Sequence, residues 1–184
     1  MIQLPTIRGL GIIRPIVIGI IIAFILRLFF FSSYIVEGSS MTPTLHDGNL
    51  VVINKLSYQF DELKRFDVIV FHANQQDDYV KRVIGLPGDR ISYEDGKLYV
   101  NGSLIEETFL EKTGGDFSYY KEISDFTLQD ITGEETVPPG MIFVIGDNRL
   151  GSYDSRHFGF IEVDQVVGKV NLRYYPFQHI DISF

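Results

Sequence analysis

The 184-residue sequence contains no cysteine, which excludes disulfide bonds and thiolate metal sites. Histidines at metal-ligand spacing are also lacking, so neither a metal nor another cofactor is expected. Acidic residues are missing from residues 1–31, which carry only three arginines. All 24 Asp and Glu lie in residues 32–184 beside 13 Lys and Arg, giving this part a formal charge of −11. Nucleic acid is therefore excluded as a partner, because phosphate binding needs a basic face.

Residues 12–31 form a long apolar run that is interrupted only by two arginines and one proline. A helix of 20 residues is about 30 Å long, which matches the hydrocarbon core of a bilayer. A cleavable signal peptide would need a small-x-small site, which does not follow, and a buried helix would be unusually apolar on every face. The sequence therefore predicts a single transmembrane anchor at 12–31. The positive-inside tendency places residues 1–11 in the cytoplasm and residues 32–184 outside the plasma membrane.

Beyond the predicted anchor, the sequence is typical of short β-strands bounded by turn residues. Residues 91–107 indicate a three-strand meander, and residues 108–136 are weakly patterned, so a meander and an insertion together occupy about 91–137. No helical period is evident outside the anchor. We expect one mainly β domain over 32–184, an antiparallel β-barrel or folded sheet. The other expected strands are 49–55, 67–72, 79–84, 141–147 and 166–175.

Three polar segments are candidates for chemistry. Residues 38–45 contain Ser40 in a Ser- and Pro-containing stretch, which by itself predicts only a loop. Residues 79–89 include Lys81 and Arg82 within a strand that is apolar on both faces, so one of these basic side chains must enter a buried environment. Residues 146–156 are a dense polar cluster after a buried strand, which alone would be a solvated loop.

Taken in order, these segments resemble the boxes of the type I (leader) signal peptidases. The matching motifs are Ser-Met-x-Pro-Thr-Leu, Lys-Arg-x-x-Gly-x-Pro-Gly-Asp and Gly-Asp-Asn-Arg…Ser-x-Asp-Ser-Arg, preceded by a membrane span. The resemblance covers essentially the whole chain and is closest to the small, single-span enzymes typical of Gram-positive bacteria. It implies a membrane-bound serine endopeptidase that removes N-terminal signal peptides from exported preproteins, cutting after a small-x-small motif. The implied partners are preproteins and the lipid bilayer.

The resemblance makes Ser40 the nucleophile and Lys81 its general base. A hydroxyl is a poor nucleophile until a base takes its proton, and lysine is a base only when neutral. Lowering its pKa from about 10.4 to about 7–8 requires roughly 3–4 kcal/mol of destabilisation of the ammonium, which burial among apolar side chains can supply. The resemblance also implies supporting roles for Ser152 bonded to the Lys81 amine, for an Arg82–Asp147 ion pair and for an Asp154–Arg156 ion pair.

The chain departs from some relatives at two positions. The Ser40 backbone N–H would form one arm of an oxyanion hole, but Gly38 stands where some relatives supply a serine hydroxyl as the second arm. Phe66 stands where relatives usually carry glycine. We expect an extended signal peptide to pair with strand edges near 34–37 and 78–80. Its shallow apolar pockets would be lined by Tyr34, Val36, Met41, Leu45 and Val80.

Other classes of protein were weighed against this interpretation. A Ser-His-Asp hydrolase would need a Gly-x-Ser-x-Gly elbow, which is absent around Ser40, and none of the four histidines lies in a recognisable catalytic setting. A membrane-anchored binding module without activity would be a paralogue that had lost the dyad, whereas both Ser40 and Lys81 are present. A self-cleaving repressor with the same chemistry would carry a DNA-binding domain in place of the apolar N-terminal segment.

Overall fold

The computed structural model describes residues 13–22, 31–55, 63–110 and 123–182. Its larger sheet has seven strands, all paired antiparallel, in the order β1-β2-β11-β3-β4-β9-β10. The chain thus enters at an edge strand, and its last long strand lies in the middle of the sheet. The bounds are β1 (Phe31–Ile35), β2 (Leu50–Asn54), β11 (Val166–Tyr175), β3 (Val68–His72), β4 (Asp78–Gly85), β9 (Met141–Ile145) and β10 (Ile161–Glu162).

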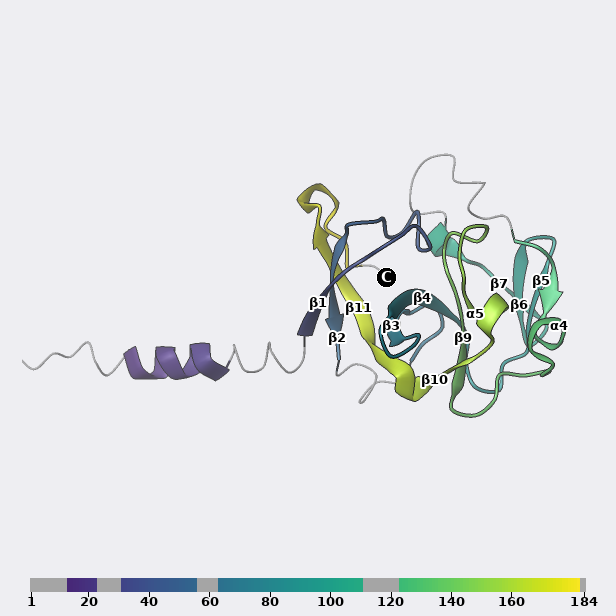
Figure 1. Ribbon diagram of the computed structural model, residues 1–184, viewed down its shortest axis with the longest axis horizontal. Coiled ribbons are helices and arrows are strands. Elements are labelled where there is room, and N and C mark those ends of the chain that lie inside the picture. Colours follow the sequence, from purple (N-terminus) through teal and green to yellow (C-terminus); the bar gives the residue numbers. More distant parts are fainter. Residues whose placement is uncertain (1–12, 23–30, 56–62, 111–122, 183–184) are drawn as a thin grey trace, which may run out of the picture.

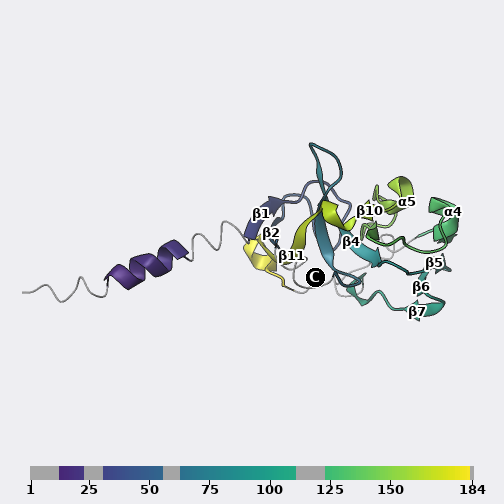
Figure 2. The same cartoon turned by 90° about the horizontal axis from the view of Figure 1, so that it is seen from below.

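A second, four-stranded antiparallel sheet has the order β7-β6-β5-β8. It lies at the opposite end of the molecule from β1 and β2 (Figures 1 and 2). Its hairpin turns place Asp95 and Asn101 at positive φ, each followed by a glycine, which is the turn chemistry that the sequence indicated. The bounds are β7 (Ser103–Ile105), β6 (Lys97–Val100), β5 (Ile91–Glu94) and β8 (Phe126–Thr127).

The predicted strands and the meander are confirmed, with bounds that shift by one or two residues. Two short helices, α4 (Leu128–Thr132) and α5 (Ser155–Phe158), were not predicted. Helices of four or five residues are too short to show a helical period, and both begin at capping side chains, Thr127 and Asp154. Single 3-10 turns form η1 (Thr108–Leu110), η2 (Val163–Gln165) and η3 (Phe177–His179).

The large sheet is folded rather than closed. Among the described residues, no pairing joins the edge strands β1 and β10, so the antiparallel folded sheet is confirmed and the barrel alternative is not realised. The expected insertion is partly ordered into the small sheet, because β8 pairs with β5. Residues 111–122 of that insertion lie outside the described residues.

The predicted anchor is only partly described. Residues 13–22 are helical and their large apolar side chains are about half exposed, whereas residue 12 and residues 23–30 lie outside the described part of the chain. Within the described part, no helix combines the length and the hydropathy of a membrane span.

Apolar side chains cover both faces of the large sheet. One face carries Val51, Val68, Val70 and Val170, and the other carries Ile69, Phe71, Val83 and Val144. A third cluster fills the space between the two sheets. Any polar side chain in the middle of β4 therefore projects into apolar packing, which is the condition that the candidate site needs.

Phe66 adopts a left-handed backbone conformation, with φ of 75°. A Cβ in this region costs about 1–2 kcal/mol, which explains why glycine suits the position in relatives. Phe66 retains the conformation because its N–H donates to the carbonyl of Val83 at 2.7 Å, and its ring lies 5.0 Å from that of Phe109. The side chain offsets some of the strain through this packing.

We therefore expect Phe66→Gly to be more stable than Phe66→Ala by about 1 kcal/mol, because alanine loses the ring and keeps the strained Cβ. Urea unfolding of the two variants measures the difference. Leu104, in strand β7, is the matched control position, where the order should be reversed and alanine should be the more stable. Equal stability of the two Phe66 variants would contradict the strain.

Candidate active site

Lys81 lies in the middle of β4, opposite Ile69 of β3, and only 4% of its surface is exposed. Its Nζ lies 2.9 Å from Ser40 Oγ and donates to the carbonyl of Val80 at 3.0 Å. Burial lowers the Lys81 pKa to about 8, although the carboxylates of Asp154 and Asp147 act in the opposite direction. A lysine with this pKa is partly neutral near physiological pH and can accept a proton.

Ser40 lies in the loop between β1 and β2 and is partly exposed. The loop is held against residues 146–151: the Asn148 N–H donates to the Ser40 carbonyl at 3.0 Å, and Asn148 Nδ2 donates to the Ser39 carbonyl at 3.2 Å. Gly146 allows this approach, because a Cβ there would lie 2.4 Å from the Ser40 carbonyl oxygen. The first and third sequence boxes are thus joined at the nucleophile.

The pairing of Arg82 with Asp147, which the resemblance implied, is present and fully buried. Arg82 Nε and Nη2 donate to the two carboxylate oxygens at 2.9 and 2.6 Å, and 1% or less of either side chain is exposed. The Thr44 hydroxyl donates to the same carboxylate, and the Phe109 ring lies 3.9 Å from the Arg82 guanidinium carbon. Loss of either partner would leave an unpaired buried charge.

Asp154 and Arg156 also form the implied pair, at 2.8 Å. The buried Asp154 carboxylate accepts the Gly146 N–H at 3.0 Å and caps α5. Burial raises the pKa of Asp154, but the hydrogen bonds and charge of Arg156 together with the Gly146 N–H lower it by more, so the net shift is downward. The carboxylate is therefore held in its charged form.

The Ser152 hydroxyl does not make the expected hydrogen bond to the Lys81 amine. It is buried and lacks a partner in hydrogen-bonding geometry among the described residues, although it lies close enough to Asp154 to help lower the pKa of that carboxyl. The Lys81 amine is instead engaged by Ser40 and Val80. Ser152 thus lies beside the dyad without bonding to it.

Gly38 has φ of 82°, and its N–H donates to the Asp47 carboxylate at 2.8 Å. A residue with no side chain and an engaged N–H does not supply the second oxyanion donor in this structure.

A pocket of about 350 Å³ opens beside Ser40 and Lys81. Three of the five predicted pocket residues line it: Tyr34, Val36 and Val80. Met41 and Leu45 do not line it: they are at most 1% exposed and pack in the core cluster that contains Val36, so their part in substrate binding stays a prediction. Alternation along a strand could not place them, because residues 41–45 form turns rather than a strand.

Arg149 is a buried residue of the third box whose partners the sequence did not reveal. Its guanidinium, 2% exposed, donates to Glu107 at 2.6 Å and to the Tyr93 hydroxyl at 2.7 Å. Burial acts to lower the Arg149 pKa, whereas the neighbouring Tyr93 and Glu107 act to raise it, and the net shift is upward. This network ties the small sheet to the loop that holds Ser40 through Asn148. The sequence feature that could have pointed to a role for Arg149 is its place as the arginine of the Gly-Asp-Asn-Arg motif.

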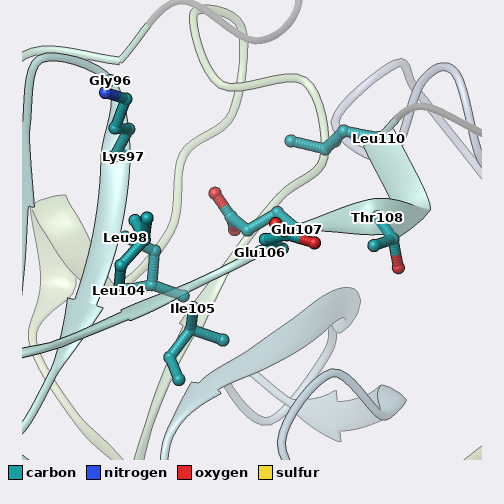
Figure 3. A pocket seen from close by; sticks show the side chains of 9 residues that line it. All are labelled: Gly96, Lys97, Leu98, Leu104, Ile105, Glu106, Glu107, Thr108 and Leu110. Carbon is teal, nitrogen blue, oxygen red and sulfur yellow. The ribbon is translucent and has the colours of Figure 1, made fainter.

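A separate pocket of about 370 Å³ lies on the small sheet, with Leu98 and Leu104 on one side and Leu110 on the other (Figure 3). Glu107 also lines it, but this carboxylate is paired with Arg149. Lys97, the lysine of this pocket, is exposed, whereas Lys81 is buried. The arrangement of a hydroxyl against a buried amine is therefore what marks the pocket beside Ser40. Within the described residues, no group of three carboxylate or histidine side chains could hold a metal ion.

Residues 10–175 match the protein family described as "Signal peptidase, peptidase S26", and the chain belongs to that family. It is 54% identical over 170 residues to Signal peptidase I of Bacillus caldolyticus, a match that covers 92% of this chain and 93% of that protein. It is 41% identical over 180 residues to Signal peptidase IB of Staphylococcus aureus strain MRSA252, covering 94% and 92% of the two chains. The predicted resemblance to type I signal peptidases is thereby confirmed.

The fold agrees with this family. The crystal structure of a signal peptidase I from Enterococcus faecalis V583 is similar with a TM-score of 0.51 and 40% sequence identity. The similarity covers 59% of this chain and 97% of that one.

The buried amine should cost stability at neutral pH. The Lys81 pKa is about 8 in the folded protein, whereas an unperturbed lysine, as in the unfolded chain, has a pKa of 10.5. Between these two pH values the unfolded chain therefore binds more protons than the folded protein. The penalty, roughly 3 kcal/mol, is fully present below pH 8 and disappears as the pH rises to 10.5. We expect Lys81→Met to be more stable than wild type at pH 7, by up to this amount, and to lose its advantage by pH 10.5. Urea unfolding across this range measures it, with exposed Lys97→Met as the unaffected control.

Proposed function

We propose that this protein removes N-terminal signal peptides from exported preproteins, as a serine endopeptidase in which Ser40 is the nucleophile and Lys81 the general base. The observation that carries the proposal is the 2.9 Å contact between Ser40 Oγ and the amine of Lys81, a residue that is only 4% exposed. Family membership supports the substrate class, because the relatives are named signal peptidases.

The proposed chemistry begins with neutral Lys81 taking the proton of the Ser40 hydroxyl as Oγ attacks the scissile carbonyl carbon. The negative charge that develops on the carbonyl oxygen is stabilised by the Ser40 backbone N–H. The Lys81 ammonium then gives its proton to the leaving amine, and the signal peptide remains as an ester on Ser40. Lys81 next deprotonates a water molecule, whose attack releases the signal peptide and returns the proton to Ser40.

The supporting residues act on position rather than on proton transfer. Asp147 and Arg82 neutralise each other inside the core, and Asp154 is engaged by Arg156 and by the Gly146 N–H. These contacts hold residues 146–156 against β4 and against the Ser40 loop. We assign Ser152 a place beside the Lys81 amine, where its hydroxyl can accept a hydrogen bond when the ammonium forms.

The substrate would bind as an added β-strand. β1 is an edge strand, and β4 pairs with β9 only from Arg82 onward, which leaves the edge at 78–80 unpaired within the described residues. An extended peptide between residues 34–37 and 78–80 would place its small residues, one and three positions before the cut, in the pocket lined by Tyr34, Val36 and Val80.

We also propose that residues 12–31 anchor the protein in the plasma membrane as a single span, with 1–11 in the cytoplasm and the catalytic domain 32–184 outside. Only eight residues separate Phe31 from Ser40, so the anchor would hold the nucleophile near the lipid surface, where a signal peptide emerges.

Both dyad residues should be essential. We expect Ser40→Ala and Lys81→Ala each to lower kcat/KM for a preprotein with an Ala-x-Ala site by about 10⁴-fold or more, since a nucleophile and its base act as one unit. The matched controls are Ser39→Ala and Lys97→Ala, which remove exposed side chains of the same kinds and should retain activity. For wild type, kcat/KM should rise with pH and level off above about pH 8, because the base works only when unprotonated. Cleavage by either dyad variant, or a rise that continues to pH 10.5, would refute the mechanism.

The anchor has its own test. Full-length protein should sediment with membranes, and a variant lacking residues 1–31 should stay in the soluble fraction. Replacing 12–31 with an unrelated apolar helix of equal length should restore sedimentation, because length and hydropathy are what the bilayer requires. Full-length protein in the soluble fraction would contradict the anchor.

A further inference from the structure

A third cavity, of about 310 Å³, lies next to the pocket of the dyad and has aromatic walls. We call it the aromatic pocket. Its rings are in mutual contact: the Phe71 and Tyr79 centroids are 6.1 Å apart, and those of Tyr153 and Phe158 are 5.7 Å apart. Its lining residues are Phe71, Ala73, Asn74, Tyr79, Tyr153, Phe158, Phe160, Ile161 and Gln165.

The aromatic pocket adjoins the catalytic pocket. Tyr79 and Tyr153 line both cavities, so these two rings form the shared wall. The Tyr79 ring centroid lies 5.2 Å from Lys81 Nζ, which places the wall directly beside the dyad. Tyr153 is 59% exposed, and a ring at this rim is accessible to a bound peptide.

The catalytic pocket is lined from both faces of β4, by Tyr79 and by Val80, whereas the aromatic pocket is lined only from the face of Tyr79. Val80 packs with the cluster that contains Val36 and Val70, whereas Tyr79 packs with Phe71 on the other face. Successive side chains of an extended peptide also point to opposite faces. If the two small residues of the cleavage motif face Val80, the residue between them must face Tyr79 and Tyr153.

The geometry points to the aromatic pocket as a subsite for the middle residue of the small-x-small motif, with a preference for large apolar or aromatic side chains. This inference rests on the proposed function and adds a specificity that the small-x-small rule leaves open. The occupant is a side chain of the preprotein itself, because the aromatic pocket shares Tyr79 and Tyr153 with the pocket in which that substrate is proposed to bind. An apolar side chain there would be stabilised by burial against five aromatic rings.

The experiment uses the full-length protein and preproteins that differ only at the middle position, Ala-x-Ala with x as Ala, Asn, Leu or Phe. We expect kcat/KM to be about tenfold higher for Leu and Phe than for Ala, the lower end of the discrimination that hydrophobic pockets achieve. Asn, which is similar to Leu in size, should resemble Ala. Equal cleavage of all four substrates would overturn the inference while leaving the proposed function intact, whereas no cleavage of any of them would contradict the proposed function.

Substitutions that fill the aromatic pocket provide a second test of the inference. Ala73→Leu and Ala73→Trp add volume at its wall without removing an aromatic ring, and they should reduce the preference for Phe over Ala to about twofold or less. Leu104→Trp, which fills the distant pocket of Figure 3, is the control and should keep the tenfold preference. A preference that survives in a folded Ala73 variant, or an equal loss for all substrates, would refute the assignment. The wild-type series decides the matter if neither variant folds.

Discussion

The structure depends on keeping one amine buried without giving it a carboxylate partner. Asp147 and Asp154 are the charges that act to raise the Lys81 pKa, and either of them, if free, would hold the amine protonated. Each is instead bound by an arginine, Asp147 by Arg82 and Asp154 by Arg156. The two ion pairs therefore have an electrostatic role beside their structural one. The two arginines pair with the carboxylates of Asp147 and Asp154, so burial has the largest effect on the Lys81 pKa and lowers it.

Two neighbouring residues of β4 are buried basic side chains with different surroundings. Lys81 and Arg82 differ by one residue, so alternation directs them to opposite faces. Arg82 reaches a buried carboxylate, the Thr44 hydroxyl and an aromatic ring, and it remains charged. Lys81 meets a serine hydroxyl and a carbonyl oxygen, neither of which carries charge. The same strand thus buries one cation with full compensation and the other with little, and only the second has a lowered pKa.

The sequence predicts the parts of this site that local pattern or motif controls. Runs of β-branched residues gave β2, β3, β4, β9 and β11, and the family boxes gave the two ion pairs. Contacts between distant segments were not predictable: Glu107 and Arg149 are 42 residues apart, and nothing near either residue indicates the other. Met41 and Leu45 lie in turns, which have no period from which to infer a face, so strand alternation could not show that both side chains are buried. The resemblance implied a hydrogen bond from Ser152 to the Lys81 amine. A sequence motif indicates which residues lie near each other, but it does not fix the geometry that a hydrogen bond needs.

Strand alternation also sets what a substrate can present to the enzyme. In the proposed binding mode, a peptide added between β1 and β4 would follow the same two-residue period as the strands, so its side chains would divide between the face of Val80 and the face of Tyr79. The first face lines a pocket of about 350 Å³ beside Ser40, and Met41 and Leu45 are buried in the core cluster that contains Val36. The second face lines a cavity walled by aromatic rings. A groove whose two faces differ in this way would contact alternate side chains of a bound peptide with different chemistry.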